Sequence, residues 1–327
     1  MIAPSMPGET VSVVIPCYNA APFVAEAIKS VLAQDWPYTE IIVIDDASTD
    51  GSWEVIERYR PRIQAVRLAE NGGAAAARNR GVALSRGGWL MFLDADDRLS
   101  PDAVRWMMET ARREPGAMVH CGWRYLVRER ESWVPRAPAR HVPTGDALRD
   151  WLEGGFVPTC SLLWPRAVYA ATGGWDESLT LNDDGDLAMR ALAAGARLVR
   201  AEGGEGLYRR HGGERVSMST DVAGEPKIRS GMRALEKISY VLYTQGRLDA
   251  YRAQIGAAYR ELALYAFRAG RSALGRECLA HAGDEAGRGT GARTFGGRML
   301  TRVLGLEGKE RIAAALGRRI AGGEVAR

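Results

Sequence analysis

Hydrophobic and polar positions alternate along the first hundred residues in blocks that predict strands followed by helices. Short apolar runs rich in β-branched residues, typical of strands buried in a parallel sheet, cover residues 11–16 and 40–46, and two further strands are expected over residues 63–70 and 89–97. Between these strands, apolar residues recur at helical spacing over residues 22–34 and 48–59, and a third helix is expected over residues 74–86. Strands and helices in alternation predict a doubly wound α/β sheet with right-handed crossovers.

The helix boundaries follow from single residues. Pro22 suits a first helical turn, and Ser48, Thr49 and Asp50 are residues that favour a helix N-cap. A further helix is expected over residues 101–113.

The pattern changes in the second half of the chain. Residues 120–145 read as strands with a Pro-interrupted loop, and residues 144–210 form a second mixed block. From Pro226 onward the spacing is helical, with a Gly/Arg-rich link at residues 283–297 and one last helix after it. This part resembles a single TPR-like hairpin, so we expect an appended helical subdomain.

Composition narrows the class of protein. The chain has 327 residues, 46% of them hydrophobic, which indicates a globular protein and excludes disorder or a coiled coil. The formal net charge is +4, and residues 283–327 hold nine Lys/Arg against five Asp/Glu, which is the whole excess. The neutral body argues against nucleic-acid binding, whereas the basic tail is compatible with an anionic membrane surface.

The cysteines and the chain start indicate the compartment. Cys17, Cys121, Cys160 and Cys278 lie far apart without a CxxC pair, as expected of reduced thiols rather than a disulfide framework or a zinc site. The first ten residues lack the features of a secretory signal, and no apolar run is long enough to span a bilayer. We therefore expect a cytoplasmic protein.

Two acidic clusters follow predicted strands. Asp45 and Asp46 end one strand, and "MFLDADDRL" places Asp94, Asp96 and Asp97 after another. Like charges this close raise each other's pKa unless a cation lies between them. Ligands of such sheets bind beyond the carboxyl ends of the strands, so we expect one shared cleft. A solvated acidic turn is the alternative, and the pattern of an EF-hand is absent.

Four ordered motifs together resemble family 2 glycosyltransferases with the GT-A fold, over roughly residues 10–212. The motifs are "VSVVIPCYNAAPFVAEAIKSVLAQ", "IIVIDDASTDGS", "NGGAAAARNRGVALSRGGWLMFLDADD" and "TGGWDESLTLNDDGDLAMRALAAG". The resemblance implies a Rossmann-like doubly wound mixed sheet and a non-processive, inverting enzyme.

The resemblance also implies a division of the chain. We expect a tail over residues 1–10 and a GT-A domain over 11–215, whose halves, 11–115 and 116–215, bind nucleotide and acceptor. The helical region then covers residues 225–327.

The resemblance assigns the donor site. Asp46 matches the acid that accepts a hydrogen bond from uracil, and Pro16 and Tyr18 match positions lining the same base pocket. A capped helix is the structural alternative for the stretch after Asp46. Arg78 matches an arginine that contacts the phosphate or sugar, although it could equally cap a surface helix.

The resemblance also assigns a metal site for Mn²⁺ or Mg²⁺, which prefer oxygen ligands and retain waters and substrate phosphates. Asp96 contacts the ribose or the metal, and Asp97 ligates the metal directly, while Asp94 orients the loop. His211 matches a histidine found near metal and diphosphate in many members, although lone histidines are usually not ligands.

A second acidic motif, "LNDDGDLAMRAL", supplies the acceptor side. Asp184 matches the general base, which takes the proton of the acceptor hydroxyl. Asp183 stands where members usually carry Glu, a departure that leaves activity open; N-capping of a helix is the alternative for both. Asp186 and Arg190 are spaced as a structural helix pair. Trp175 matches an aromatic residue bordering the acceptor pocket, although a Trp is more often core.

The expected activity is transfer of a hexose-type sugar from a nucleoside diphosphate sugar to an acceptor hydroxyl in bacterial surface polysaccharide synthesis. The expected donor is UDP-linked, and the expected acceptor is a glycan or a lipid-linked molecule. An inactive nucleotide-sugar-binding module is the alternative. A sugar-nucleotide pyrophosphorylase fits poorly, because "PCYNAAPF" is not its Gly-rich loop. The amphipathic tail either packs on the helical subdomain or contacts the inner face of the membrane.

Overall fold

The computed structural model describes residues 8–138, 145–180, 182–211 and 224–283. Within them the chain forms two compact units. One unit holds the described residues within Met1–Asp150, Gly155–Glu177 and Asp183–Arg215, and the other holds those within Trp151–Gly154, Ser178–Asn182 and Val216–Arg327. The domain limits expected at 11–215 and 225–327 remain predictions.

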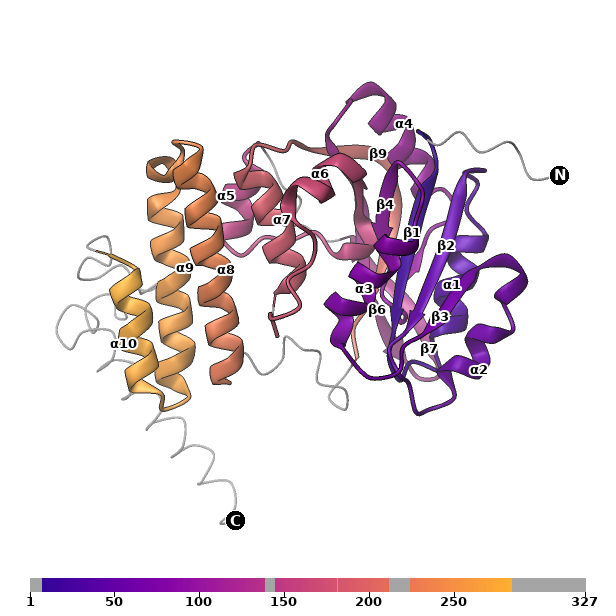
Figure 1. Ribbon diagram of the computed structural model, residues 1–327, viewed down its shortest axis with the longest axis horizontal. Coiled ribbons are helices and arrows are strands. Elements are labelled where there is room, and N and C mark those ends of the chain that lie inside the picture. Colours follow the sequence, from indigo (N-terminus) through magenta and orange to yellow (C-terminus); the bar gives the residue numbers. More distant parts are fainter. Residues whose placement is uncertain (1–7, 139–144, 181, 212–223, 284–327) are drawn as a thin grey trace, which may run out of the picture. The chain divides into compact units, whose positions relative to one another are not determined.

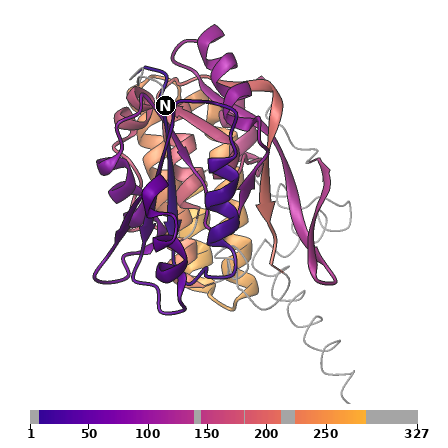
Figure 2. The ribbon, with the colours of Figure 1, turned by 90° about the vertical axis from the view of Figure 1, so that its right-hand side faces the viewer.

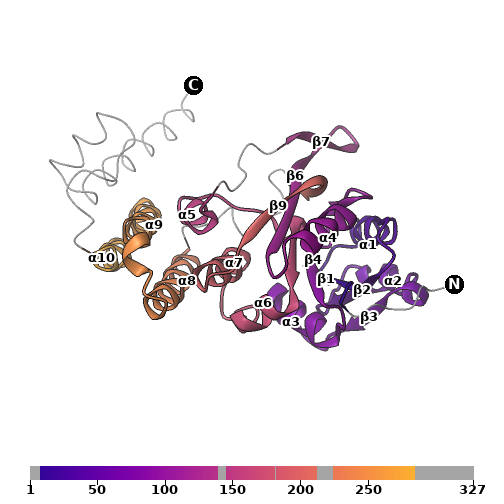
Figure 3. The same cartoon turned by 90° about the horizontal axis from the view of Figure 1, so that it is seen from above.

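The first unit is built on a nine-stranded mixed sheet (Figures 1 and 3). Its strands are β1 (Val11–Cys17), β2 (Thr39–Asp45), β3 (Gln64–Arg67), β4 (Trp89–Phe92), β5 (Arg98–Leu99), β6 (Met118–Glu129), β7 (Ser132–Pro138), β8 (Leu162–Pro165) and β9 (Leu198–Arg209). The order is β3-β2-β1-β4-β8-β6-β9-β5, and β7 pairs with β6. This confirms the expected α/β class and the mixed, doubly wound sheet.

The parallel half of the sheet follows the apolar pattern of its strands. All seven residues of β1 are buried, which places it between the parallel neighbours β2 and β4. Pro16 pairs with Ile44 and Cys17 with Asp45, so the carboxyl ends of β1 and β2 lie together. The acidic residues that follow β2 and β4 therefore lie at one edge of the sheet.

Helices cover both faces of this sheet (Figure 3). The helices up to Ala193 are α1 (Val24–Leu32), α2 (Ser52–Glu57), α3 (Gly73–Leu84), α4 (Ala103–Arg113), α5 (Ala147–Leu152), α6 (Arg166–Thr172) and α7 (Asp183–Ala193), with short 3-10 helices at Arg60–Arg62 and Thr159–Ser161. Helix α5 is divided between the two units and is not one of the helices that cover the sheet. One core contains apolar side chains of α1 and α4, and a smaller cluster joins α3 to the opposite face of β2.

The N-cap expected at Ser48 to Asp50 lies too early, because the N-cap position is Gly51, at φ 87°, and helix α2 begins at Ser52. Asp50 still acts at this helix end, since its Oδ1 accepts the Ser52 N–H at 3.1 Å. The same polar side chains also hold the loop after β1: Ser48 Oγ accepts the Asn19 N–H at 3.0 Å, and Asp50 Oδ2 accepts the Ala21 N–H at 3.0 Å. These donors are backbone N–H groups of the loop after β1, which is distant in the sequence, so the local pattern could not predict the bonds.

The β6–β7 hairpin carries the strand region expected at residues 120–145 (magenta in Figure 2). Strand β6 also pairs in parallel with β9, and between His120 and Gly122 the pairing skips from Arg200 to Glu205. The extra residues of β9 form a bulge, where Gly204 at φ 76° leaves no room for a Cβ beside Ala103.

The second unit contains the helices α8 (Glu225–Thr244), α9 (Leu248–Arg268) and α10 (Ser272–His281). Helix α9 packs against both α8 and α10, and Gly275 allows the Phe267 ring to approach, because a Cβ there would lie 2.4 Å from that ring. The helical character expected from Pro226 onward is confirmed, while the expected last helix lies outside the described residues. Within the described residues, no helix is long and apolar enough to cross a membrane.

Candidate active site

The end of β2 forms the first part of the candidate site. Asp46 is 2% exposed, and its two carboxylate oxygens accept the backbone N–H groups of Gly72 and Gly73, each at 2.8 Å. The Gly-rich loop before α3 is thereby fixed against β2. Each oxygen keeps a further lone pair for a ligand.

Asp45, beside it, is fully buried. Its Oδ2 lies 3.2 Å from Arg67 Nε, and burial raises the pKa of its carboxyl. Pro16 lies within β1, and Tyr18 follows that strand with 51% of its surface exposed. The structure thus brings Pro16, Tyr18 and Asp46, the predicted base pocket, to one edge of the sheet.

The residues after β4 form a second acidic cluster. Asp94 is partly exposed, whereas Asp97 is fully buried and accepts the backbone N–H of Arg209 at 2.7 Å. Burial, then the charges of Asp96 and Asp94, raise the pKa of Asp97. Asp96 faces His211, with Oδ2 and Nε2 2.7 Å apart.

Arg78 joins this cluster to the second acidic motif. Its side chain is 6% exposed; Nη2 lies 2.6 Å from Asp94 Oδ1 and Nη1 lies 2.8 Å from Asp183 Oδ2. Asp94 and Asp183 are 89 residues apart in the sequence, and one buried guanidinium connects them. Arg78 is therefore part of the site and does not cap a surface helix.

The start of α7 carries the predicted base. Asp184 accepts the N–H of Gly185 at 2.8 Å. Burial, followed by the neighbouring charge of Asp183, raises the pKa of Asp184 to about 6, while Arg78 lowers it. A carboxyl with this pKa is ionised at neutral pH and basic enough to accept a proton there.

Trp175 and Asn79 connect α3 to the turn before α7. Trp175 is 4% exposed; its ring packs edge-on against Phe92, and Arg78 Cζ lies 4.3 Å from its centroid. Asn79 donates to the Trp175 carbonyl at 3.0 Å and accepts its N–H at 3.1 Å. The Trp175 ring thus packs against the Arg78 guanidinium and helps to hold it in place. The contact of Trp175 with the acceptor stays a prediction.

The expected pair of Asp186 and Arg190 is confirmed. Arg190 Nη2 lies 2.7 Å from the fully buried Asp186 Oδ2, and the guanidinium also donates to the carbonyls of Thr172 and Gly174. These bonds fix the turn that leads to α7, which is a structural role.

Arg209 is a site residue that sequence reasoning missed. Its guanidinium has no exposed surface; Nε donates to the Asp96 carbonyl at 2.5 Å and Nη2 lies 2.7 Å from Glu26. Arg209 Cζ lies 4.6 Å from the ring centroid of Phe23 and 4.4 Å from that of Trp133. Both rings also contact the His211 ring. In the sequence "LYRRH", only the histidine matched a known position of the family, so nothing in the sequence pointed to Arg209.

The residues at this edge fit a metal in part. Within the described ranges, no three His, Cys, Asp or Glu side chains are grouped to hold an ion. Asp96 and His211 nevertheless present a carboxylate oxygen and an imidazole nitrogen side by side, with 29% and 15% of their side chains exposed. Since Mg²⁺ and Mn²⁺ retain waters and substrate phosphates, two protein ligands suffice.

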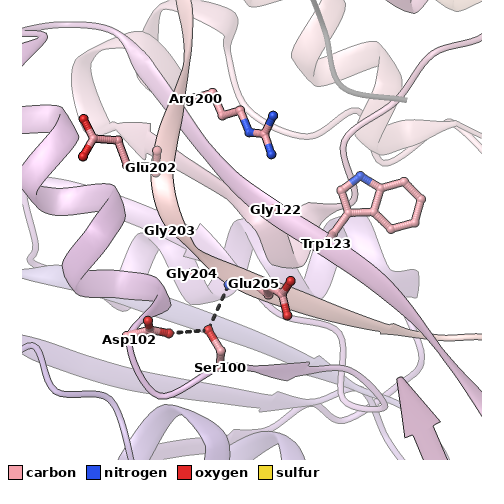
Figure 4. Close-up of a pocket in the computed structure, with 10 residues that line it drawn as sticks. Ser100, Asp102, Gly122, Trp123, Arg200, Glu202, Gly203, Gly204 and Glu205 are labelled. Carbon is pink, nitrogen blue, oxygen red and sulfur yellow. Dashed lines mark hydrogen bonds between the residues drawn. The ribbon is translucent and has the colours of Figure 1, made fainter. Parts of the chain in front are cut away.

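A separate hollow of about 370 Å³ lies at the bulge of β9 (Figure 4). Its carboxylates already have partners: Asp102 accepts the Ser100 hydroxyl at 2.7 Å, and Glu205 pairs with Arg124 at 2.8 Å. The hollow has no predicted site residue in its lining, and we assign it no function.

Comparisons with known proteins agree with this geometry. The family model described as Glycosyl transferase family 2 matches residues 12–170. Succinoglycan biosynthesis protein ExoO of Rhizobium meliloti is 38% identical over 199 residues, covering 57% of this chain and 57% of ExoO. The chain thus spans little more than half the length of this curated relative.

Two solved structures share the fold. S. aureus TarS in complex with UDP-GlcNAc aligns with a TM-score of 0.57 at 17% identity, over 84% of this chain and 89% of TarS. The mannosyltransferase PcManGT of Pyrobaculum calidifontis, in complex with GDP-Man and Mn²⁺, aligns with a TM-score of 0.53 at 20% identity, over 95% and 88%. The sheet is therefore of the GT-A type, and residues 12–170 carry the match to glycosyl transferase family 2.

Proposed function

We propose that this chain is an inverting glycosyltransferase that moves a sugar from a nucleoside diphosphate sugar to an acceptor hydroxyl. The observation that carries the proposal is the buried Arg78, which brings Asp94 and Asp183 within 2.8 Å of one guanidinium. Through it, the acidic cluster after β4 and the carboxylate of Asp184 belong to one site. Transfer chemistry needs both, one beside the leaving diphosphate and one beside the attacking hydroxyl.

Asp184 is the proposed catalytic base. With its pKa raised to about 6 by burial and by Asp183, the carboxylate is ionised at pH 7 and accepts the proton of the acceptor hydroxyl as its oxygen attacks the anomeric carbon. A direct displacement of this kind inverts the anomeric configuration and needs no enzyme nucleophile. Asp183, fixed by Arg78, is the proposed neighbour of the acceptor, together with Trp175.

The proposed donor site lies along the ends of β1, β2 and β4. Asp46, with Pro16 and Tyr18, holds the nucleobase, for which uracil is our proposal because Asp46 keeps acceptor lone pairs for a ring N–H. TarS was solved with UDP and with UDP-GlcNAc, whereas PcManGT was solved with GDP-Man, so other bases belong in the test.

The proposed metal ligands are Asp96 and His211. A Mn²⁺ or Mg²⁺ ion bound there would stabilise the leaving diphosphate as a Lewis acid. Asp97 was the predicted direct ligand; its complete burial and its bond to the Arg209 N–H favour Asp96 for that role. Asp97 holds β9, and so His211, in place.

The proposed setting is bacterial surface polysaccharide synthesis, since ExoO is named as a succinoglycan biosynthesis protein. A glycan or lipid-linked acceptor, a cytoplasmic location and contact of the basic tail with the inner membrane face belong to the same proposal. The tail segment that carries this last point lies outside the described residues.

The test is thermal unfolding with UDP, GDP, CDP and dTDP, each with and without Mn²⁺. A ligand at a hundred times its Kd stabilises the folded chain by about 2.7 kcal/mol. We expect UDP with Mn²⁺ to raise Tm most, and the Asp96→Asn variant to lose the Mn²⁺-dependent part. A chain that no nucleotide stabilises would contradict the donor site.

An inactive nucleotide-sugar-binding module is the alternative function. Thermal unfolding reports binding but not turnover, so a second experiment must distinguish this module from an enzyme. Asp183, in place of the Glu usual in the family, is the observation that favours the inactive module. Nucleotide binding without release of UDP from any UDP-sugar, in water or with acceptors, would identify the chain as such a module.

A further inference from the structure

Strands β6 and β9 run side by side (Figure 3). Four aromatic rings gather at this pair of strands. The ring centroid of Trp123 lies 5.0 Å from those of Tyr125 and Phe156. The ring centroid of Tyr125 lies 5.8 Å from that of Tyr208, its partner in the β6–β9 pairing. We name Trp123, Tyr125, Phe156 and Tyr208 the aromatic platform. None of the roles assigned above uses these residues.

The platform adjoins the carboxylates of the proposed active site. Tyr208 directly precedes Arg209, whose backbone N–H is bonded to Asp97. The charges of Asp97, Asp94 and Asp184 are close enough to Tyr208 to add to the effect of burial in raising the pKa of its hydroxyl. Tyr208 is therefore next in sequence to a residue bonded to Asp97, and the charge of Asp184 acts on its hydroxyl.

Among the described residues, the polar ends of the platform have no hydrogen-bond partner. Tyr125 and Tyr208 are half-buried, and neither hydroxyl is hydrogen-bonded to another described residue. The indole N–H of Trp123 is buried and also has no partner among those residues. A buried tyrosine or tryptophan usually finds a hydrogen-bond partner, and packing alone would be served by phenylalanine. These polar groups indicate a ligand with hydroxyls.

We propose that the aromatic platform binds the acceptor as a sugar ring, stacked on Tyr208 with one hydroxyl directed to Asp184. This inference rests on the proposed glycosyl transfer and names its acceptor class. A pyranose combines a face of C–H groups, which suits an aromatic ring, with a rim of hydroxyls that hydrogen-bond to tyrosine. Arg210 lies 5.4 Å from the Tyr125 ring, so the stacking is assigned to Tyr208 and the rim contact to Tyr125.

The experiment measures binding of simple glycosides by saturation-transfer difference NMR. The probes are the methyl β-glycosides of glucose, galactose and N-acetylglucosamine, each added to the full chain with UDP and Mn²⁺. We expect transfer to the C–H protons of at least one probe, and an affinity about fivefold weaker in Tyr208→Leu. Tyr208→Phe should retain most of the stacking, and Tyr243→Leu, which removes a tyrosine 71% exposed on α8, should change nothing.

Two outcomes would overturn the platform: equal binding by Tyr208→Leu and the unchanged chain, or no transfer to any glycoside. Tyr125→Leu provides the same comparison if Tyr208→Leu does not fold by circular dichroism. The rise in Tm with UDP and Mn²⁺, measured on the same samples, reports the donor site separately. Loss of that rise contradicts the proposed function, whereas a normal rise without glycoside binding contradicts only the platform.

Discussion

The two acidic clusters at the carboxyl edge of the sheet are held in different ways. After β2, Asp46 is bonded to two backbone N–H groups, those of Gly72 and Gly73. After β4, Asp94 is held by the side chain of Arg78, which also binds Asp183 on α7. One cluster depends on the path of the backbone, and the other depends on charged side chains from separate segments.

This difference suits the two proposed tasks. A nucleobase needs a fixed hydrogen-bonding edge, which backbone N–H groups provide by holding Asp46 still. A leaving diphosphate and an attacking hydroxyl change their charge during the reaction, and a cluster of interacting ionisable groups responds to such changes. The second cluster should therefore be the more sensitive to substitution and to pH.

The largest effect is expected from Asp184→Asn. Removal of the proposed base should lower kcat for transfer by about 10²–10⁴-fold, with little change in UDP affinity. Asp249→Asn, which alters an exposed acid on α9, is the matched control. Transfer at the normal rate by Asp184→Asn would remove this residue from the mechanism.

The same variant has a second expected signature in stability. The pKa of Asp184 is raised in the folded chain, so its ionisation disfavours folding as pH rises from the unfolded value of 3.8 to about 6. Relative to the unchanged chain, Asp184→Asn should therefore gain stability between pH 4 and pH 7. Thermal unfolding at both pH values measures the difference, and a relative loss of stability over that range would contradict the raised pKa.

Arg78→Met comes next in size. It leaves Asp94 and Asp183 without their shared cation, and breaking a buried pair costs about 3–5 kcal/mol; the partial exposure of both carboxylates places the expected loss near 3 kcal/mol. Urea unfolding of Arg78→Met beside Arg80→Met, an exposed arginine on the same helix, measures it. A loss equal to that of Arg80→Met would show that Arg78 does not hold the cluster.

The pH profile of transfer should report the same cluster. Below pH 6 the rate should fall about tenfold per pH unit, because protonated Asp184 cannot accept a proton. Arg78 lowers the pKa of Asp184, so Arg78→Met should move the midpoint to higher pH. Measuring kcat from pH 4.5 to 8 at saturating donor tests both statements. A midpoint that is the same in Arg78→Met and the unchanged chain would contradict the effect of Arg78 on the pKa of Asp184.

The smallest effect is expected after β2. Asp46→Asn replaces one acceptor with an NH₂ group that faces an N–H of the glycine loop, at a cost of about 1–2 kcal/mol. Urea unfolding at pH 7, with the exposed Glu54→Gln as control, measures this loss beside that of Arg78→Met and tests whether the two clusters differ as described.

The sequence by itself determined the secondary structure of the parallel half-sheet. The largely apolar β1 and the helices α1 and α4 follow from the spacing of apolar residues, which is a property of neighbouring positions in the chain. Because parallel strands end at one edge, the acidic residues after β2 and β4 were also placed together by sequence alone.

Only the tertiary structure decided how the acidic residues are held. Arg78 meets Asp183 across 105 positions and Arg209 meets Asp97 across 112, and the aromatic platform joins β6 to β9. No local pattern encodes such contacts, because the pairing of β6 with β9 and the bulge at Gly204 arise only when distant segments pack. Side-chain periodicity is a property of neighbouring residues, whereas the chemistry of this site depends on residues that only folding brings together.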